Sequence, residues 1–318
     1  MTAVAVAAMG TNAAEPAWAR FAAGNVLPFE GPAVSSSTFA AFEVDAADAA
    51  CDDAWRALGT REAYDGYRLA MRREMYRAIG TFPERTPLNA KTVATCRRDG
   101  YTIEKVIFES MPNVFVTGNL FIPDGSGRRP AVVMSCGHSA EGKDCDIYLR
   151  ACVIAAKRGF VTFMFDPYQQ GERRMGRLAS SVNFHTQMGL RGELIDWSAP
   201  LLRICDGLGA MCYLLGAPLV GRRASDLLVL ADVLAKRYGG KRPHLVVSGF
   251  LSIPAAHAVA ADPAAFAQVA LSGEHPSWRE ALVAGAEGDG VMLRYADVVP
   301  RACLSYDWPE LLGRWGDL

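Results

Sequence analysis

A serine lies next to the position where a nucleophilic serine would be expected. Residues 246–256, VVSGFLSIPAA, read as an apolar strand, a glycine turn and the start of a helix. In such a unit the nucleophile occupies the middle of Gly-x-Ser-x-Gly, but here Leu251 stands two places after Gly249 and Ser252 follows one place late. Since one residue turns a helical side chain by about 100°, Ser252 is either a displaced nucleophile or the N-cap of the following helix.

Two histidines follow predicted buried strands and could transfer protons. His138 comes directly after an apolar run that ends in Gly137, a residue that lets the backbone approach a ligand closely. His275 follows another such run and stands beside Glu274, and a Glu–His pair in a cleft can carry out acid–base chemistry. The alternatives are a polar loop position for His275 and a purely backbone role for His138.

The segment DPYQQGERR, residues 166–174, is the third group of candidates. We expect Asp166 to orient its neighbours at the end of a strand. Glu172 and Arg173 are predicted to form a salt-bridged turn at the floor of the site, where such pairs are often architecture. The predicted catalytic residues are therefore Ser252, His138 and His275, and the predicted binding residues are Gly137, Ser139, Gln170, Glu172, Arg173, Leu251 and Glu274.

The composition argues against several functions. The 318 residues carry 33 Lys and Arg against 34 Asp and Glu, so no basic surface for nucleic acid is predicted. The most apolar later stretch, residues 201–221, contains Arg203 and Asp206 and indicates a buried helix rather than a membrane span. No basic residue precedes the apolar start of the chain, which favours a cytoplasmic protein.

The eight cysteines indicate reduced thiols rather than a disulfide framework or a metal site. None forms a C-x-x-C pair, and most lie among apolar residues. The spacing of Cys136, His138 and Cys145 matches no common zinc pattern, and Cys136 is predicted to be a buried thiol. We expect no metal and no cofactor.

Strands and helices that alternate along the chain must position these residues. Buried strands are predicted at residues 104–110, 114–123, 130–137, 160–166, 244–249 and 268–273, and helices at 52–79, 146–159, 200–215, 225–238 and 254–262. The pattern predicts an α/β fold with a mostly parallel sheet and helices on both faces. We divide the chain into a tail and helical arm, residues 1–95, and an α/β domain, residues 96–318. Ligands of such sheets bind at the carboxyl ends of the strands.

Four segments in order resemble the acetylxylan-esterase-like branch of the α/β-hydrolase superfamily. They are FPERTPLNAKTVATCRRDGYTIEKVIFES, CGHSAEGK, FDPYQQGERR and GRRASDLLVLADVL, and the resemblance covers residues 80–310. It implies a serine esterase with a small-molecule substrate, in which the N–H of His138 and the N–H after the nucleophile bind the oxyanion. The chain departs from the family at Leu251, and it ends at residue 318, before the strands expected to carry the triad acid and histidine.

Three functions follow from this resemblance and its departures. The leading hypothesis is an esterase-like hydrolase of a small acyl or carbohydrate ester, with Ser252 as nucleophile and His275 or His138 as base. The second is a non-hydrolytic lyase or cyclase in which His138, Glu172 and His275 move protons around a carbonyl. The third is a catalytically inactive member that binds a ligand or a partner, because apolar surface left by the arm and the C-terminal edge could be covered in a homodimer.

Overall fold

The computed structural model describes residues 56–174, 207–238, 240–272, 277–287 and 294–313, with residues 46, 49 and 53 before them. The strands are β1 (Lys91–Arg98), β2 (Tyr101–Met111), β3 (Val114–Pro123), β4 (Ala131–Ser135), β5 (Val161–Phe165), β6 (His244–Ser248) and β7 (Val269–Ser272). The α-helices with defined bounds are α3 (Arg61–Ile79), α4 (Asp146–Lys157), α6 (Leu219–Arg237), α7 (Ser252–Ala261), α8 (Trp278–Glu287) and α9 (Glu310–Gly313). Short 3-10 turns are η1 (Gly142–Asp144), η2 (Gly171–Arg173), η4 (Gly249–Leu251) and η5 (Ala302–Leu304).

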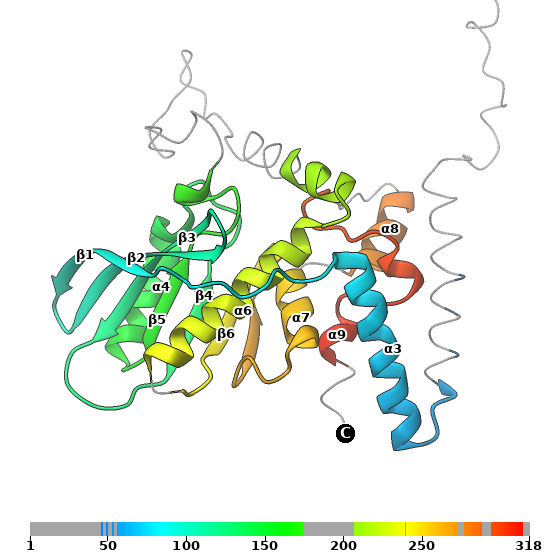
Figure 1. The fold of residues 1–318 in the computed structure, drawn as a ribbon, viewed down its shortest axis with the longest axis horizontal. Coiled ribbons are helices and arrows are strands. Elements are labelled where there is room, and N and C mark those ends of the chain that lie inside the picture. Colours follow the sequence, from blue (N-terminus) through cyan, green and yellow to red (C-terminus); the bar gives the residue numbers. More distant parts are fainter. Residues whose placement is uncertain are drawn as a thin grey trace, which may run out of the picture.

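The described strands form one sheet in the order β1-β2-β3-β5-β4-β6-β7 (Figure 1). The neighbours β5, β4, β6 and β7 pair in parallel, whereas β1, β2, β3 and β5 pair antiparallel in sequence. All six predicted strands are present, and the predicted α/β fold is confirmed. The seventh, β1, was not predicted, because most of its eight residues are exposed and give no buried pattern.

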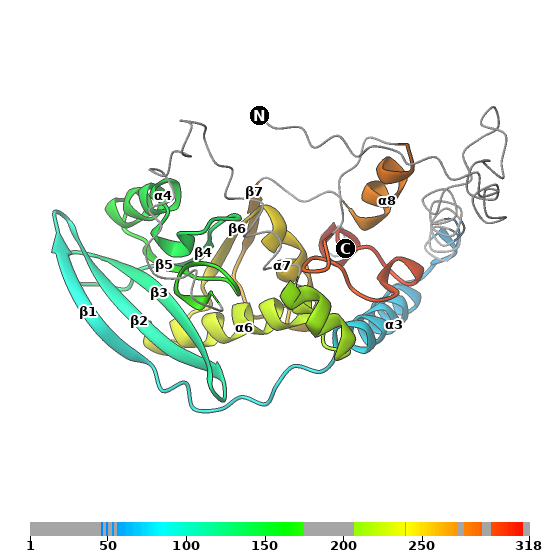
Figure 2. The ribbon, with the colours of Figure 1, turned by 90° about the horizontal axis from the view of Figure 1, so that it is seen from above.

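Helices cover both faces of the sheet (Figure 2). On one face, Val133, Phe163 and Leu245 belong to the large core that includes the apolar side of α6. On the other face, Met134 and Met164 pack with residues of α4. Because successive side chains of a strand point to opposite faces, the continuously apolar strands supply both cores.

The N-terminal arm belongs to the main core rather than standing apart from it. Met71 and Met75 of α3 are buried in the same cluster as α6 and α7. The predicted single helix over 52–79 is interrupted at residues 57–60. Residues 53 and 56 are helical, and α3 then begins anew after Thr60, whose Oγ1 accepts a hydrogen bond from the N–H of Ala63. Gly80 ends α3 as predicted, with a positive φ of 77°. The proposed division at residue 95 stays a prediction, although that position lies inside β1.

The helix that supports the site begins earlier than the sequence indicated. The sequence predicted a helix from residue 225, but α6 begins at Leu219 and Ser225 is buried within it. Pro218 precedes the first turn, a place where proline is well tolerated. Residues 207–214 are also helical, within the predicted helix over 200–215. The early start places Arg223 and Asp226 one turn apart inside a single buried helix.

One apolar surface groove lies along the α4 side of the sheet. It has a volume of about 630 Å³, and its lining includes Met134, Val246 and Ala270, which are paired neighbours on β4, β6 and β7. The predicted homodimer stays a prediction. No helix in the described part of the chain combines the length and apolarity needed to cross a membrane.

Candidate functional site

The turn after β6 does not present a nucleophile. Leu251 has right-handed backbone angles, φ −75° and ψ −5°, in place of the strained geometry of a nucleophile elbow. Its side chain is only 1% exposed, and Ser252 is 0% exposed. Both side chains therefore belong to the core rather than to an open cleft.

Ser252 is not the N-cap that the sequence favoured. The turn η4 runs directly into α7, so Ser252 already has helical angles and its N–H donates to the carbonyl oxygen of Gly249. Its hydroxyl oxygen has no hydrogen-bond partner. An unpartnered buried hydroxyl is destabilising by about 1–3 kcal/mol. The structure thus gives this serine neither of its two predicted environments.

The turn after β4 is tightly filled by the chain's own side chains. A Cβ on Gly137 would overlap the hydroxyl of Tyr148, so a side chain of the same chain makes the close approach there; the predicted approach to a ligand stays a prediction. The N–H of Ser139 donates to Oε1 of Gln170 at 2.5 Å, so two predicted binding residues contact each other. Cys136 is fully buried as predicted, and burial raises the pKa of its thiol.

Burial and two neighbouring arginines favour the neutral form of His138. Nη1 of Arg294 lies 3.0 Å from Nδ1 of His138, and a guanidinium can only donate, so Nδ1 accepts and the ring hydrogen resides on Nε2. The ring packs on Phe250, with centroids 5.1 Å apart. Burial, together with Arg223 and Arg294, lowers the pKa of His138 to about 4.

Arg223 reaches the same place from α6. Its guanidinium lies over the ring of Phe250, 4.6 Å from the centroid. Nη1 donates to Oδ1 of Asp297 and to the carbonyl of Ala296, each at 3.1 Å. Nε and Nη2 have no hydrogen-bond partner, although the residue is 2% exposed. His138, Phe250, Arg223 and Arg294 form what we call the arginine cluster.

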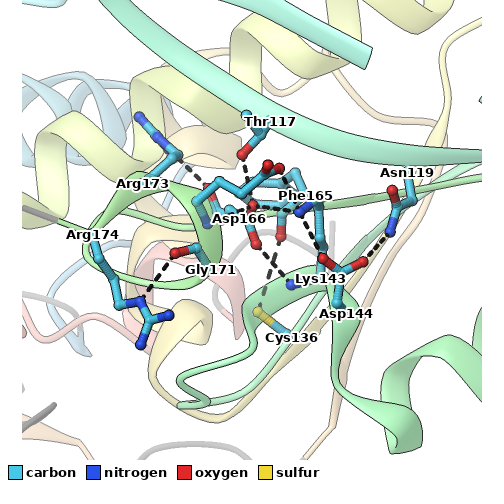
Figure 3. A network of polar contacts seen from close by, with 11 residues as sticks. Thr117, Asn119, Cys136, Lys143, Asp144, Phe165, Asp166, Gly171, Arg173 and Arg174 are labelled. Carbon is cyan, nitrogen blue, oxygen red and sulfur yellow. Dashed lines mark hydrogen bonds and ion pairs between the residues drawn. The ribbon is translucent and has the colours of Figure 1, made fainter. Parts of the chain in front are cut away.

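Asp166 organises the loops behind this turn (Figure 3). Its Oδ1 accepts from the N–H of Lys143 at 2.8 Å, and its Oδ2 accepts from Oγ1 of Thr117 at 2.6 Å and from the N–H of Glu172 at 3.2 Å. Gly171 has φ 53°, and a Cβ there would overlap Oδ1 of Asp166. The expected orienting role of Asp166 is therefore confirmed.

The ammonium of Lys143 lies at the centre of this network. It contacts Oδ2 of Asp166 at 3.1 Å, Oε2 of Glu172 at 2.8 Å and Oδ2 of Asp144 at 2.9 Å. Burial alone would lower the pKa of Lys143, but the three carboxylates raise it well above the ordinary value. We call Lys143, Asp144, Asp166 and Glu172 the lysine cluster.

Glu172 and Arg173 do not pair with each other, contrary to prediction. Glu172 pairs with Lys143, whereas Nη1 of Arg173 donates to Oδ2 of Asp226 at 2.7 Å and to the carbonyl of Asp166 at 3.0 Å. The guanidinium of Arg173 also lies 4.0 Å from the ring centroid of Tyr168. The two neighbours therefore hold different elements, η1 and α6, against the turn η2.

The remaining histidines fall into two groups. His257 is fully buried, with its ring nitrogens 2.7 Å from the carbonyl of Ile253 and 3.0 Å from the hydroxyl of Tyr306. His244 opens β6, at the end of the strand remote from the site, as predicted. His275, Glu274 and His185 lie outside the described residues.

Sequence reasoning missed the partners that create both clusters. Lys143 and Arg223 both stood inside segments that the sequence analysis quoted, CGHSAEGK and GRRASDLLVLADVL. Arg294 gave no signal, because it meets His138 across 156 positions of sequence. Within the described ranges, no group of three histidine, cysteine or carboxylate side chains could hold a metal ion.

Comparison with known proteins places the fold. No family model matches the chain, and no curated protein matches its sequence. A solved structure described as an acetyl xylan esterase from Bacteroides fragilis is similar over 90% of this chain and 74% of its own length, with TM-score 0.61 and 15% identity. A glucuronoyl esterase from Solibacter usitatus matches over 80% of this chain and 74% of its own length, with TM-score 0.48 and 13% identity. The methylesterase BT1017 matches over 72% of this chain but less than half of its own, 45%, with TM-score 0.48 and 15% identity.

Proposed function

We propose that this chain hydrolyses a small carboxylic ester without a serine nucleophile. Its fold, which is that of the α/β-hydrolase esterases, supports this proposal. The observation that carries the proposal is the hydrogen bond from Arg294 to Nδ1 of His138. This hydrogen bond places the ring hydrogen on Nε2, while burial and the neighbouring arginines favour the neutral imidazole. A neutral imidazole of lowered pKa can polarise a carbonyl and stabilise the charge that develops on its oxygen.

Water is the attacking group in this proposal. Its oxygen adds to the ester carbonyl, and His275 takes the proton that water loses. His275 follows β7 in the sequence and has Glu274 beside it, an arrangement that suits a general base. The base later returns the proton to the departing alcohol, so that an acid and an alcohol are released. Because no acyl-enzyme forms, the buried Leu251 and Ser252 present no obstacle.

The test compares histidine variants on an activated acetyl ester. His138→Ala is expected to lower kcat/KM about 100-fold or more, because it removes the donor to the oxyanion. His275→Ala should lower it by a similar factor, since general-base catalysis contributes about 10² to 10⁴. His244→Ala is the matched control, because that histidine opens β6 at the remote end of the sheet.

Two results would overturn the proposal. Labelling of Ser252 by a fluorophosphonate would show an acyl-serine mechanism, which the water mechanism excludes. Failure of the purified chain to turn over any activated ester would exclude hydrolysis. The same histidine variants would then be assayed for proton transfer next to a carbonyl, the non-hydrolytic alternative.

A further inference from the structure

The arginine cluster carries more positive charge than its carboxylates balance. Arg223 has Asp297 as its carboxylate partner. Arg294 donates to the neutral ring of His138, and none of the described carboxylates pairs with it. Among the described residues, a single carboxylate, that of Asp297, thus pairs with the two guanidinium groups beside His138. A charge imbalance of this kind, partly shielded from water, favours the binding of an anion.

The hydrogen-bonding capacity of Arg223 is also incomplete. Only Nη1 of its guanidinium is satisfied, while the donors on Nε and Nη2 have no partner in a side chain that is 98% buried. A buried donor without a partner is destabilising by about 1–3 kcal/mol, and more when it is charged. Nε and Nη2 form one edge of the guanidinium, the edge that accepts the two oxygens of a carboxylate side by side.

We infer that the arginine cluster binds the carboxylate of a small organic anion, so that the substrate of this site is an ester that also carries a free carboxylate. The inference rests on the proposed function only in naming the ligand an ester. Arg223 supplies the paired donors and Arg294 the second positive charge. The planar fork of arginine matches a planar carboxylate, and Phe250, which both Arg223 and His138 contact, supplies an apolar surface for the carbon skeleton.

Benzoate and benzamide are the probes, because they share a shape and differ in charge. The full chain is titrated with each while the ring-proton NMR signals of its histidines are followed. Benzoate should shift the His138 signal in a saturable manner, and benzamide should not. Bound benzoate should also raise the pKa of His138, because a nearby negative charge favours the imidazolium. His257, buried between Trp278 and Tyr306, is the internal reference.

Arginine variants identify the residues responsible. Arg294→Gln should weaken benzoate binding about tenfold or more, the size expected for one charge-assisted hydrogen bond. Arg223→Lys keeps a cation beside Asp297 but loses the paired donors, and it should weaken binding by a similar factor. Arg150→Gln, which removes an exposed arginine of α4, is the matched control for total charge and should bind as the original chain does.

Four results of the binding experiments would overturn the inference. They are a benzamide affinity equal to that of benzoate, unchanged benzoate binding in Arg294→Gln, no saturable shift of His138, and tighter binding of inorganic phosphate than of benzoate. Failure of the proposed hydrolysis is a separate result, because benzoate binding requires no turnover. Conversely, turnover of a neutral ester that exceeds that of its carboxylate-bearing analogue would remove the inference and leave the hydrolase intact.

Discussion

Two ion clusters, one around Lys143 and one around His138, differ in how completely their polar groups are satisfied. In the lysine cluster, both oxygens of Asp166 and the ammonium of Lys143 have partners, and the charges bind η1, η2, β3 and β5 together. In the arginine cluster, Arg223 keeps two unpartnered nitrogens and Arg294 contacts a neutral ring. Arg294 joins its cluster from a distant segment, 156 positions after His138.

This difference indicates which cluster stabilises the fold and which is available to bind a ligand. A buried ion network whose members are all paired is expected to fix loop geometry, because removing one member leaves the other charges buried without a partner. A buried cation with donors left over is costly to the folded chain, and that cost is offset when a ligand binds. We therefore assign the lysine cluster to the scaffold and the arginine cluster to recognition. The predictions below test that assignment.

The largest expected effect is on the lysine cluster. Lys143→Met leaves Asp166 buried without its counter-ion, and loss of one partner of a buried pair costs about 3–5 kcal/mol of the free energy of unfolding. Urea denaturation would measure it. Lys157→Met is the control, because the ion pair of Lys157 with Asp99 is exposed and should hardly matter. Equal stability of the two variants would contradict a structural role for the lysine cluster.

The glycine that lets Asp166 enter the turn gives the next effect. Gly171→Ala introduces a positive-φ alanine and a Cβ that overlaps Oδ1 of Asp166, and we expect a loss of about 2 kcal/mol. Gly100→Ala carries the same backbone strain, with φ 83°, but its Cβ would meet nothing within 4 Å. The difference between the thermal unfolding midpoints of the two variants measures the effect of the overlap between the new Cβ and Asp166. Equal falls in the two midpoints would show that this overlap costs nothing.

The scaffold was largely predictable from sequence, for a physical reason. Strands such as β4 and β5 are buried on both faces and therefore leave unbroken apolar runs. Gly80 and Cys136 were also placed correctly, because a positive φ and an apolar neighbourhood are local properties. β1 was missed since an exposed edge strand needs no apolar pattern.

The candidate site was predictable only where its contacts are local. Asp166 was identified because it directly follows an apolar strand, whereas its partner Lys143, 23 positions away, was missed. The pairing of Arg294 with His138 depends on how distant segments meet, which no local spacing encodes. Ser252 was misplaced for a related reason, because the choice between a cap, a nucleophile and a core residue depends on the preceding turn.

The third prediction concerns acid stability and the arginine cluster. The pKa of His138 in the folded chain is about 4, below its unfolded value near 6.5, so its contribution to stability is complete above pH 6.5 and is lost as the pH falls toward 4. Arg294→Gln removes one cation and should raise this pKa by about one unit. NMR titration would show the rise in His138 and none in His257, whose pKa is lowered to about 4 mainly by burial.

The same variant should also lose less stability in acid. One pKa unit corresponds to about 1.4 kcal/mol, so the fall in the free energy of unfolding between pH 7 and pH 4 should shrink by about 1 kcal/mol in Arg294→Gln. An unchanged pKa of His138 would mean that Arg294 does not act on the imidazole, and the arginine cluster would lose its electrostatic basis.

The smallest effect tests whether Ser252 is only a core residue. Ser252→Ala removes a hydroxyl that has no partner in the folded chain, so the free energy of unfolding should rise by up to about 1 kcal/mol. Ser135→Ala is the matched control, because its equally buried hydroxyl accepts the N–H of Ser248 at 3.0 Å and its loss should lower stability by about 1 kcal/mol. Urea denaturation would show opposite signs for the two serines. A destabilised Ser252→Ala chain would instead indicate that this hydroxyl has a hydrogen-bond partner. The contrast between the unpartnered Ser252 and the hydrogen-bonded Ser135 would then be wrong.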